Sequence, residues 1–324
     1  MAIVLGPNQY GKAEVRLVKV TRDGDRHHVK DLNVSSSLRG DFEAAHVSGD
    51  NSSVVTTDTQ KNTVYALARE HGITSIEEFA MLLGRHFTRS FDWVSGGRWA
   101  VEELTWNRIP VDGVGHDHAF SRDGSETRNT VVTMDGNQTW VVSGLSDLTI
   151  LKSTGSEFWG FPRDRFTTLG ETKDRILATS VNTRWRYAAS ATPRDQPPRD
   201  QPLGDQPARD PALGLAPDVD FDAAHADVRR IMLEAFATTH SYALQQSLYV
   251  MGEKVLEAHP EIAEIKFSMP NKHHFLVDLA PFGLDNPNEV FFAADRPYGL
   301  IEGTVTRDDA PPAGRAWETI PGFC

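Results

Sequence analysis

The chain has one cysteine, Cys324, and that residue is its last. A single thiol cannot form a disulfide within the chain and cannot supply a cysteine cluster for a metal ion. A cysteine content this low is typical of proteins in a reducing compartment, and we expect a cytoplasmic location.

Long hydrophobic runs are also lacking. No stretch of the sequence approaches the roughly 18 apolar residues that span a bilayer. Residues 1–12 have no basic segment followed by an apolar core, so they do not resemble a secretory signal. The ending Pro-Gly-Phe-Cys324 is not a Ser-Lys-Leu peroxisomal signal. We therefore expect no membrane insertion and no peroxisomal import.

Positive charge is scarce relative to negative charge. The chain has 33 lysines and arginines against 45 aspartates and glutamates, which gives a formal net charge of −12. This balance disfavours nucleic acid and anionic membranes as partners, because both need positive surface. No Gly-x-Gly-x-x-Gly or phosphate loop is present, so a nucleotide cofactor is not indicated. A small anionic substrate is still allowed, since a few local cations can bind it.

The two halves of the sequence show the same order of predicted strands and helices. In the first half, apolar alternation and turn residues predict two strands, two helices and two more strands. The first helix begins near Thr57-Asp58, and the second begins at the capping box Ser75-Ile-Glu-Glu78. The expected segments are strands at 15–20, 28–39, 98–107 and 127–143, and helices at about 57–72 and 75–87.

The second half repeats that order. Expected segments are strands at 148–152, 176–188, 261–270 and 289–293, and helices at about 220–238 and 242–258. Strands joined by short turns pair antiparallel, and helices should cover one sheet face, so we predict an α+β fold. The predicted domains are residues 1–145 and 146–305, followed by a C-terminal tail, 306–324.

A biased segment interrupts the second half at residues 191–217. It repeats Pro-Arg-Asp-Gln-Pro imperfectly and has almost no large apolar residues. Such a composition cannot offset its own ordering entropy, which predicts an exposed, mobile inserted loop without a catalytic role.

Several residues could carry chemistry, although each has an ordinary structural explanation. Lys12 could be a surface lysine, Thr57 could cap a helix, and the His273-His274 pair could lie in a loop after a strand that ends at Pro270. Phe158 belongs to an aromatic turn and Arg175 lies where a strand begins. Taken singly, none of them identifies a function.

Together these motifs resemble one family. They are Tyr10-Gly-Lys12 with Val15-Arg16, Thr57-Asp58 followed by Lys61-Asn-Thr63, Leu151-Lys-Ser-Thr-Gly-Ser156 with Phe158-Trp-Gly-Phe161, Asp174-Arg-Ile-Leu-Ala-Thr179, and Pro270-Asn-Lys-His273. Their order and character are similar to those of urate oxidases (uricases), bacterial-type members of the tunnelling fold, or T-fold. The resemblance runs from about residue 8 to about residue 305 and is broken by the 191–217 insertion.

The resemblance implies two tandem T-fold domains per chain. Subunits would pair into a β-barrel tunnel and stack into a homotetramer, which agrees with the duplicated plan. Barrel closure also removes the free sheet edges that each half would otherwise expose.

The resemblance also implies a urate site. Phe158 would stack on the rings, Arg175 would form a charged fork to one edge, and Gln245 would hold the opposite edge. Leu244 would bind through its backbone N–H; the family often has valine there, and a backbone contact tolerates the change. Thr57 and Asp58 would close the site from a neighbouring subunit.

The reaction implied is the oxidation of urate by O2 and water to 5-hydroxyisourate and hydrogen peroxide, in purine degradation. No metal or organic cofactor is implied, because urate itself supplies the electrons. Lys12, Thr57 and His273 would form a proton relay, with Lys12 as the base. Asn271 and Thr57 would hold oxygen or water above the ring.

Three alternatives remain open at this stage. His116-Asp-His118 and His27-His28 could bind a metal, although they lie in loop-like stretches without a complete ligand set. A pterin-handling member of the same fold would need another acidic anchor and often Cys or His ligands for zinc. A purine-binding scaffold with a dead site would have lost Lys12, Thr57 or His273, and all three are present.

Overall fold

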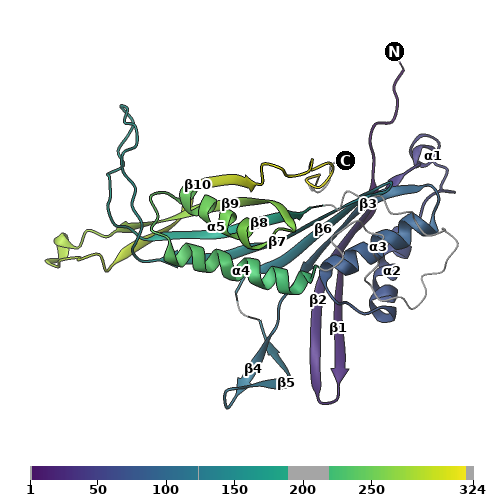
Figure 1. Ribbon diagram of the computed structural model, residues 1–324, viewed down its shortest axis with the longest axis horizontal. Helices are drawn as coiled ribbons and strands as arrows, with labels where there is room; N and C mark the ends of the chain where they lie inside the picture. Colours follow the sequence, from purple (N-terminus) through teal and green to yellow (C-terminus); the bar gives the residue numbers. More distant parts are fainter. Residues whose placement is uncertain (1, 123, 189–218, 319–324) are drawn as a thin grey trace. The chain divides into compact units, whose positions relative to one another are not determined.

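A computed structural model of the chain describes residues 2–122, 124–188 and 219–318 (Figure 1). The predicted inserted loop, 191–217, and Cys324 lie outside these ranges. The chain forms two compact units, each built from more than one stretch of sequence. The first unit comprises Met1–Gly144, Arg186–Asp222 and Ala310–Cys324, and the second comprises Leu145–Trp185 and Ala223–Asp309. The predicted T-fold domain limits at residues 145 and 305 stay a prediction.

The order of elements repeats, as the sequence predicts. The elements are β1 (Tyr10–Asp23), β2 (Arg26–Gly40), α1 (Glu43–Val47), α2 (Thr57–Glu70), α3 (Ile76–Ser90), β3 (Val94–Glu103), β4 (Asn107–Val111), β5 (Val114–Ser121), β6 (Thr127–Asp135), β7 (Gln138–Lys152), β8 (Leu177–Tyr187), α4 (Phe221–Thr238), α5 (Leu244–Ala258), β9 (Ile262–Leu276), η2 (Ala280–Phe282) and β10 (Phe291–Thr306). Two strands, two long helices and two strands occur twice, with α1, the β4–β5 pair and η2 as additions. The predicted α+β plan is confirmed.

In the first unit, the strands follow the order β1-β2-β3-β6 and continue into β7, and the pairs β1–β2, β2–β3 and β3–β6 are antiparallel. Helix α2 packs on β1, and α3 packs on β3 and β6 (Figure 1). The predicted capping box starts α3, because Ser75 Oγ accepts the Glu78 N–H at 3.1 Å. Gly84 lets the sheet approach this helix closely, since a Cβ there would lie 2.7 Å from Met134 Sδ.

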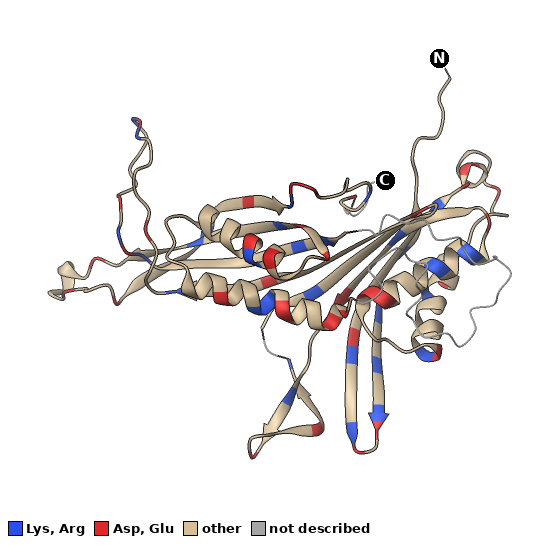
Figure 2. Cartoon of the chain, in the orientation of Figure 1, with Lys and Arg blue, Asp and Glu red and all other residues tan. Residues whose placement is uncertain are grey.

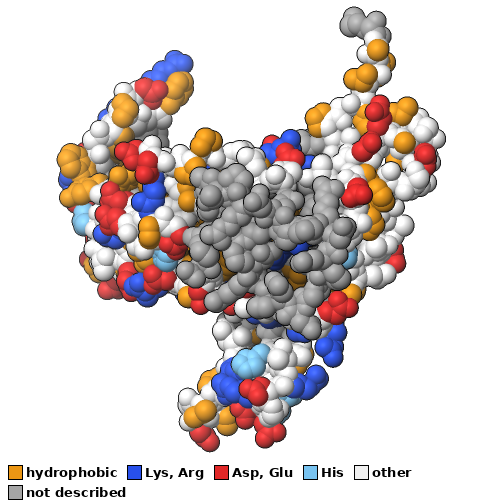
Figure 3. All heavy atoms as spheres, turned by 45° about the vertical axis from the view of Figure 1, so that its right-hand side comes forward, with side chains coloured by type: hydrophobic (Ala, Val, Ile, Leu, Met, Phe, Trp, Pro, Cys, Tyr) orange, Lys and Arg blue, Asp and Glu red, His pale blue; other side chains and the backbone are white. Residues whose placement is uncertain are grey.

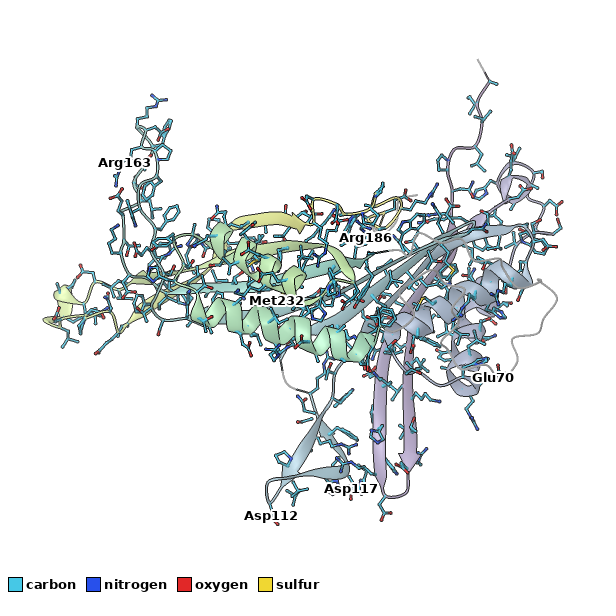
Figure 4. All side chains as sticks on the ribbon, in the orientation of Figure 1. Glu70, Asp112, Asp117, Arg163, Arg186 and Met232 are labelled. Atoms are coloured by element: carbon cyan, nitrogen blue, oxygen red, sulfur yellow. The ribbon has the colours of Figure 1, made fainter. Side chains whose placement is uncertain are left out.

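In the second unit, α5 packs on β9 and β10, which pair antiparallel. Met232 on α4 (Figure 4) is buried, as are Val228 on the same helix and Met251 on α5. The buried residues of each helix recur at spacings of three and four. Their side chains therefore share one face of the helix, and that face packs into the core. The core of this unit is completed by Trp185, which is fully buried and lies 5.7 Å from the His225 ring.

The last two predicted strands are much shorter than the observed ones. The predicted strand 261–270 continues as β9 to Leu276, and the predicted strand 289–293 becomes β10, Phe291–Thr306. Pro270 suggested a strand end because proline donates no ladder hydrogen bond. The strand nevertheless continues, because Asn271 pairs with Gly299 and, beyond an irregularity between Ala294 and Gly299, residues 273–276 pair with residues 291–294 of β10. The prediction that His273 and His274 lie in a loop was wrong.

The prediction that His116-Asp-His118 lies in a loop was also wrong. These residues belong to β5, which pairs with β4 in a two-stranded sheet. The turn is Asp112-Gly113, and both residues have positive φ, +49° and +81°. That conformation joins two strands tightly and favours Asp-Gly. The hairpin forms an arm whose turn carries Asp112 (Figure 4).

Other limits shift by a few residues. The predicted strand 98–107 begins earlier, as β3 at Val94. The predicted strands 127–143 and 148–152 are instead a hairpin of β6 and β7, because the bend at Gly136-Asn137 is a full turn and β7 runs on to Lys152. Within the described residues, no helix is both long and apolar enough to cross a membrane.

Candidate functional site

Lys12 lies near the start of β1 and is half-buried. Its strand neighbour Gly11 passes so close to β2 that an added Cβ would lie 1.8 Å from the Ser36 carbonyl oxygen, so no other residue fits there. Directly after Lys12 the register of β1 shifts. Glu14 in this bulge has a φ of +57°, and its N–H donates to Ser35 Oγ at 3.0 Å. Bulges of this kind redirect a side chain, here beside the candidate base.

Thr57 and Asp58 form the first turn of α2, and both are exposed. The residue that caps this helix is Thr56, whose hydroxyl accepts the Thr59 N–H at 3.0 Å. The structural explanation considered for Thr57, helix capping, is therefore wrong. Among the described residues, the Thr57 hydroxyl has no hydrogen-bond partner, and it lies at the positive end of the helix.

Contacts between β1, β2 and α2 bring Lys12 and Asp58 to one region of the first unit. Tyr10 Oη donates to the Val55 carbonyl at 3.1 Å, and Ser36 Oγ donates to Gln60 Oε1 at 2.6 Å. The pKa of Asp58 is lowered chiefly by its hydrogen bond from Lys61, further by the charge of Lys61 and the hydrogen bond from Asn62, and also by the charge of Lys12. Lys12, Thr57 and Asp58 thus form one group, which we call the lysine group.

In the second unit, Phe158 lies in the long segment between β7 and β8. Its N–H and C=O both bond to Thr172, each at 2.9 Å, so the two sides of the segment are tied together. Beyond this ladder the loop continues outward and carries Arg163 near its end (Figure 4). The Phe158 ring is half-buried and stacks on Phe161 at 5.1 Å between centroids.

Arg175 lies two residues before β8, which begins at Leu177. Its guanidinium carbon is 5.1 Å from the centroid of the Phe158 ring, within cation–π range. Its Nε–H donates to Ser156 Oγ at 3.1 Å. Burial lowers the pKa of Arg175, although a guanidinium keeps its charge at neutral pH. No partner for its two terminal nitrogens is found among residues 2–122, 124–188 and 219–318.

Helix α5 begins at Leu244, which is buried, and Gln245 follows with an exposed side chain. Ala243 precedes them and provides no side-chain cap. The first N–H groups of a helix have no partner within it, so this end offers donors and positive potential to a ligand. The prediction that Gln245 lies near a helix start is confirmed.

Asn271 and His273 are two residues apart on β9. Side chains with this spacing project from the same face of a strand. Both are half-buried, and the opposite strand is irregular at their level, between Ala294 and Gly299. The His273 ring stacks on Phe275 with centroids 5.8 Å apart. Because the two side chains share a face, they can address one ligand.

The structure therefore divides the predicted residues between the two units, and we name the two sets by unit. The lysine group belongs to the first unit. The second group, which we call the arginine group, belongs to the second unit and consists of Phe158, Arg175, Leu244, Gln245, Asn271 and His273. Ser156, which the sequence did not predict as a site residue, is fully buried and contacts Arg175. Its place two residues before Phe158 in the quoted motif was the available signal.

The helices carry charges of both signs (Figure 2). The histidines considered as metal ligands lie on the β4–β5 arm and at the start of β2, with His116 4.5 Å and His27 5.8 Å from the His118 ring. Figure 3 shows histidine side chains on the lower projection, among basic and acidic ones. Within the part of the chain that is described, no group of three or more His, Cys, Asp or Glu could hold a metal ion.

The repeated ββααββ plan defines a class: a T-fold protein, which here has an arginine beside an aromatic ring. Comparison with known proteins gives the family. The family model described as "Uricase" matches residues 8–133 and 141–302. Uricase from Arthrobacter globiformis is 58% identical over 322 residues, covering 99% of this chain and 96% of the relative. Uricase from Oryctolagus cuniculus is 38% identical, covering 92% of this chain and 93% of the relative.

Solved structures agree. The crystal structure of uricase from Arthrobacter globiformis has a TM-score of 0.85 at 57% identity and covers 98% of this chain and 100% of its own. Urate oxidase from Bacillus sp. TB-90 has a TM-score of 0.72 at 24% identity, covering 93% of this chain and all of its own, which shows the shared fold. The chain belongs to the uricase family.

Proposed function

We propose that this protein is a urate oxidase that converts urate, O2 and water into 5-hydroxyisourate and hydrogen peroxide. Urate loses two electrons and O2 gains them, while the oxygen of water is added to the purine ring. Membership of the uricase family supports the activity. The structural observation that supports it best is Arg175, whose guanidinium lies 5.1 Å from the Phe158 ring and has no described partner for its terminal nitrogens.

Urate is a flat, electron-rich anion, and the arginine group suits it. Phe158 offers a ring face for stacking, and Arg175 offers parallel N–H donors for a carbonyl and ring nitrogen edge. Gln245 would bind the opposite edge, next to the backbone N–H of Leu244. That N–H belongs to the uncapped start of α5, where the helix dipole also favours an anion.

Proton transfer would use residues of both groups. Lys12, in its neutral form, would accept a proton through the hydroxyl of Thr57, and His273 would complete the relay. Removing a proton from bound urate raises its electron density, which makes electron transfer to O2 easier. Asn271 and Thr57 would hold oxygen, then peroxide, then the attacking water, above the ring. The protein thus supplies deprotonation, placement and shielding, whereas the substrate supplies the electrons.

The assembly is part of this proposal. The family resemblance has Thr57 and Asp58 reach the site from a neighbouring subunit of a homotetramer. Lys12 exerts its charge on Asp58 of its own chain. We therefore propose that each site joins the lysine group of one subunit to the arginine group of another, with Asp58 closing it. A cytoplasmic location, predicted from the sequence, also remains part of the proposal.

The experiment is urate turnover by purified protein treated with a chelator and then freed of it. We expect loss of the ultraviolet absorbance of urate, with one O2 consumed and one peroxide formed for each urate. The same sample without oxygen should leave urate unchanged. Activity that vanishes with the chelator and returns with a metal would overturn the cofactor-free reaction, and failure to consume urate in every sample would overturn the proposed function.

A further inference from the structure

Ser156 is the only side chain to which Arg175 is hydrogen-bonded within the described residues. The Arg175 Nε–H donates to Ser156 Oγ at 3.1 Å, and Ser156 has no exposed surface. A guanidinium carries five N–H donors in one plane. Using the Nε–H on serine leaves the four N–H groups of the two terminal nitrogens, and these form the edge that a planar anion can meet.

Backbone hydrogen bonds of the neighbouring residues on both sides fix the position of Ser156. On one side, the Glu157 N–H donates to the Ser241 carbonyl at 2.7 Å, and the Ser241 N–H donates to the Gly155 carbonyl at 2.9 Å. On the other side, Phe158 is bonded twice to Thr172. A hydroxyl on so constrained a backbone can fix the position of the arginine that it contacts.

The chain that carries Arg175 is tied to the same segment. Thr154 Oγ1 donates to Asp174 Oδ1 at 2.7 Å, and Thr172 Oγ1 donates to the Asp174 carbonyl at 2.5 Å. These bonds place the backbone of Arg175, but they do not set its side-chain torsions. Of the polar contacts described, the one that sets the plane of the guanidinium is the bond to Ser156.

We infer that Ser156 is a positioning residue for the substrate: its hydroxyl holds the guanidinium of Arg175 beside the Phe158 ring so that the terminal nitrogens form a fixed fork. This inference rests on the proposed urate oxidase function. Without the hydroxyl, Arg175 can rotate, and the substrate must then order it on binding. The loss of binding free energy is then equal for the bound substrate and for the transition state. KM therefore rises while kcat changes little.

The experiment compares Ser156→Ala with wild type in urate turnover. We expect KM to rise about tenfold or more, as for loss of a hydrogen bond to a charged group, with kcat within about twofold. Ser153→Ala is the matched control, because Ser153 is an exposed serine of the same motif. Ser156→Thr keeps a hydroxyl, so its KM should lie closer to the wild-type value than the KM of Ser156→Ala. A purely structural role would instead lower the fraction of folded enzyme, and hence kcat, at an unchanged KM, and that outcome would overturn the inference.

A double-mutant cycle guards against poor folding of the threonine variant. Lysine has no Nε–H in the guanidinium position, so Arg175→Lys removes the group that Ser156 holds. In that background, Ser156→Ala should raise KM by less than about twofold. Equal effects of Ser156→Ala with arginine and with lysine would refute the inference. Wild-type protein that does not consume urate would refute the proposed function itself, so the two failures are distinguishable.

Discussion

In the first unit, Arg128 Nη2 lies 2.8 Å from Glu77 Oε2, and both side chains are buried. Glu77 Oε1 also accepts the Ser143 hydroxyl at 2.6 Å, and Arg128 Nη1 lies 2.5 Å from Asp222 Oδ1. This network joins the first turn of α3 to β6 and to the start of α4. Burial raises the pKa of Glu77, and the charge of Arg128 and the hydrogen bond from Ser143 oppose that rise.

Replacing Arg128 by methionine should destabilise the protein by about 3–5 kcal/mol at neutral pH, because it leaves a buried carboxylate without its partner. The pKa of Glu77 then rises further. A carboxyl whose folded pKa exceeds its unfolded pKa binds more protons in the folded state, so stability increases as pH falls through that window. The difference in the free energy of unfolding between wild type and Arg128→Met should therefore shrink from pH 8 towards pH 5. Thermal or denaturant unfolding measures it.

The control for this prediction is Arg26→Met. Arg26 Nη1 lies 3.0 Å from Asp117 Oδ1, but both side chains are about half exposed. An exposed pair contributes about 1 kcal/mol or less, so this variant should be nearly as stable as wild type. A deficit in Arg128→Met that stays constant between pH 5 and pH 8 would contradict titration of Glu77.

His86 on α3 gives a second pH-dependent effect. Burial lowers the pKa of His86, with the charge of Glu70 acting in the opposite direction. A histidine with a depressed folded pKa binds more protons when unfolded. It therefore contributes stability above the unfolded pKa, which is lost as pH falls from that value through the lower folded pKa. His86→Gln should flatten the decline in stability between about pH 7 and pH 5.

Unfolding of the His86→Gln variant across this pH range is the measurement, with His28→Gln as the control at an exposed position. The control should keep the wild-type slope. If both variants decline as steeply as wild type, another group causes the acid sensitivity.

Lys12→Met tests the proposed base. Methionine matches much of the apolar length of lysine but cannot accept a proton, so we expect urate binding to persist and kcat to fall about 10²–10⁴-fold. Binding would be measured by equilibrium titration without oxygen, and turnover by urate absorbance. Lys19→Met serves as the control, since Lys19 donates to the Ala68 carbonyl, farther along β1. Unchanged turnover in Lys12→Met would remove Lys12 from the relay.

Mixing two inactive variants tests whether subunits share a site. Lys12→Met leaves the arginine group intact, and Arg175→Gln leaves the lysine group intact. If each site joins groups from two subunits, random hybrids should regain about one quarter of the sites, and activity should appear on co-expression. If one chain supplies both groups, hybrids would remain as inactive as their parents, and the shared-site proposal would fail.

Much of the fold follows from local sequence. The helix α3 was predictable because Ser75 and Glu78 form a capping box ahead of an apolar stripe, and both features act within a few residues. The end of β9 was not predictable. Pro270 marks a local stop, but main-chain pairing with β10 carries the strand on to Leu276, and that pairing joins residues far apart in sequence.

The β4–β5 arm was predictable only in part. Its Asp112-Gly113 turn is a local signal for a hairpin, but the flanking residues lack regular apolar alternation, so the pattern predicted a loop. Likewise, Thr56 rather than Thr57 caps α2, and only the position of the first helical turn decides between neighbouring threonines. The choice matters for the proposed proton relay, because within the described part of the chain the Thr57 hydroxyl is then not used in capping.

The sequence by itself determined the duplicated plan, the helix faces and the residue types of the proposed site, because periodicity, capping and motif order are properties of neighbouring residues. Only the tertiary structure decided which of those residues meet. The bond between Ser156 and Arg175, the charge of Lys12 on Asp58 and the burial of Glu77 beside Arg128 all depend on segments that fold together from distant parts of the chain. Such contacts form because packing and backbone pairing bring those segments together, and no local pattern encodes their geometry.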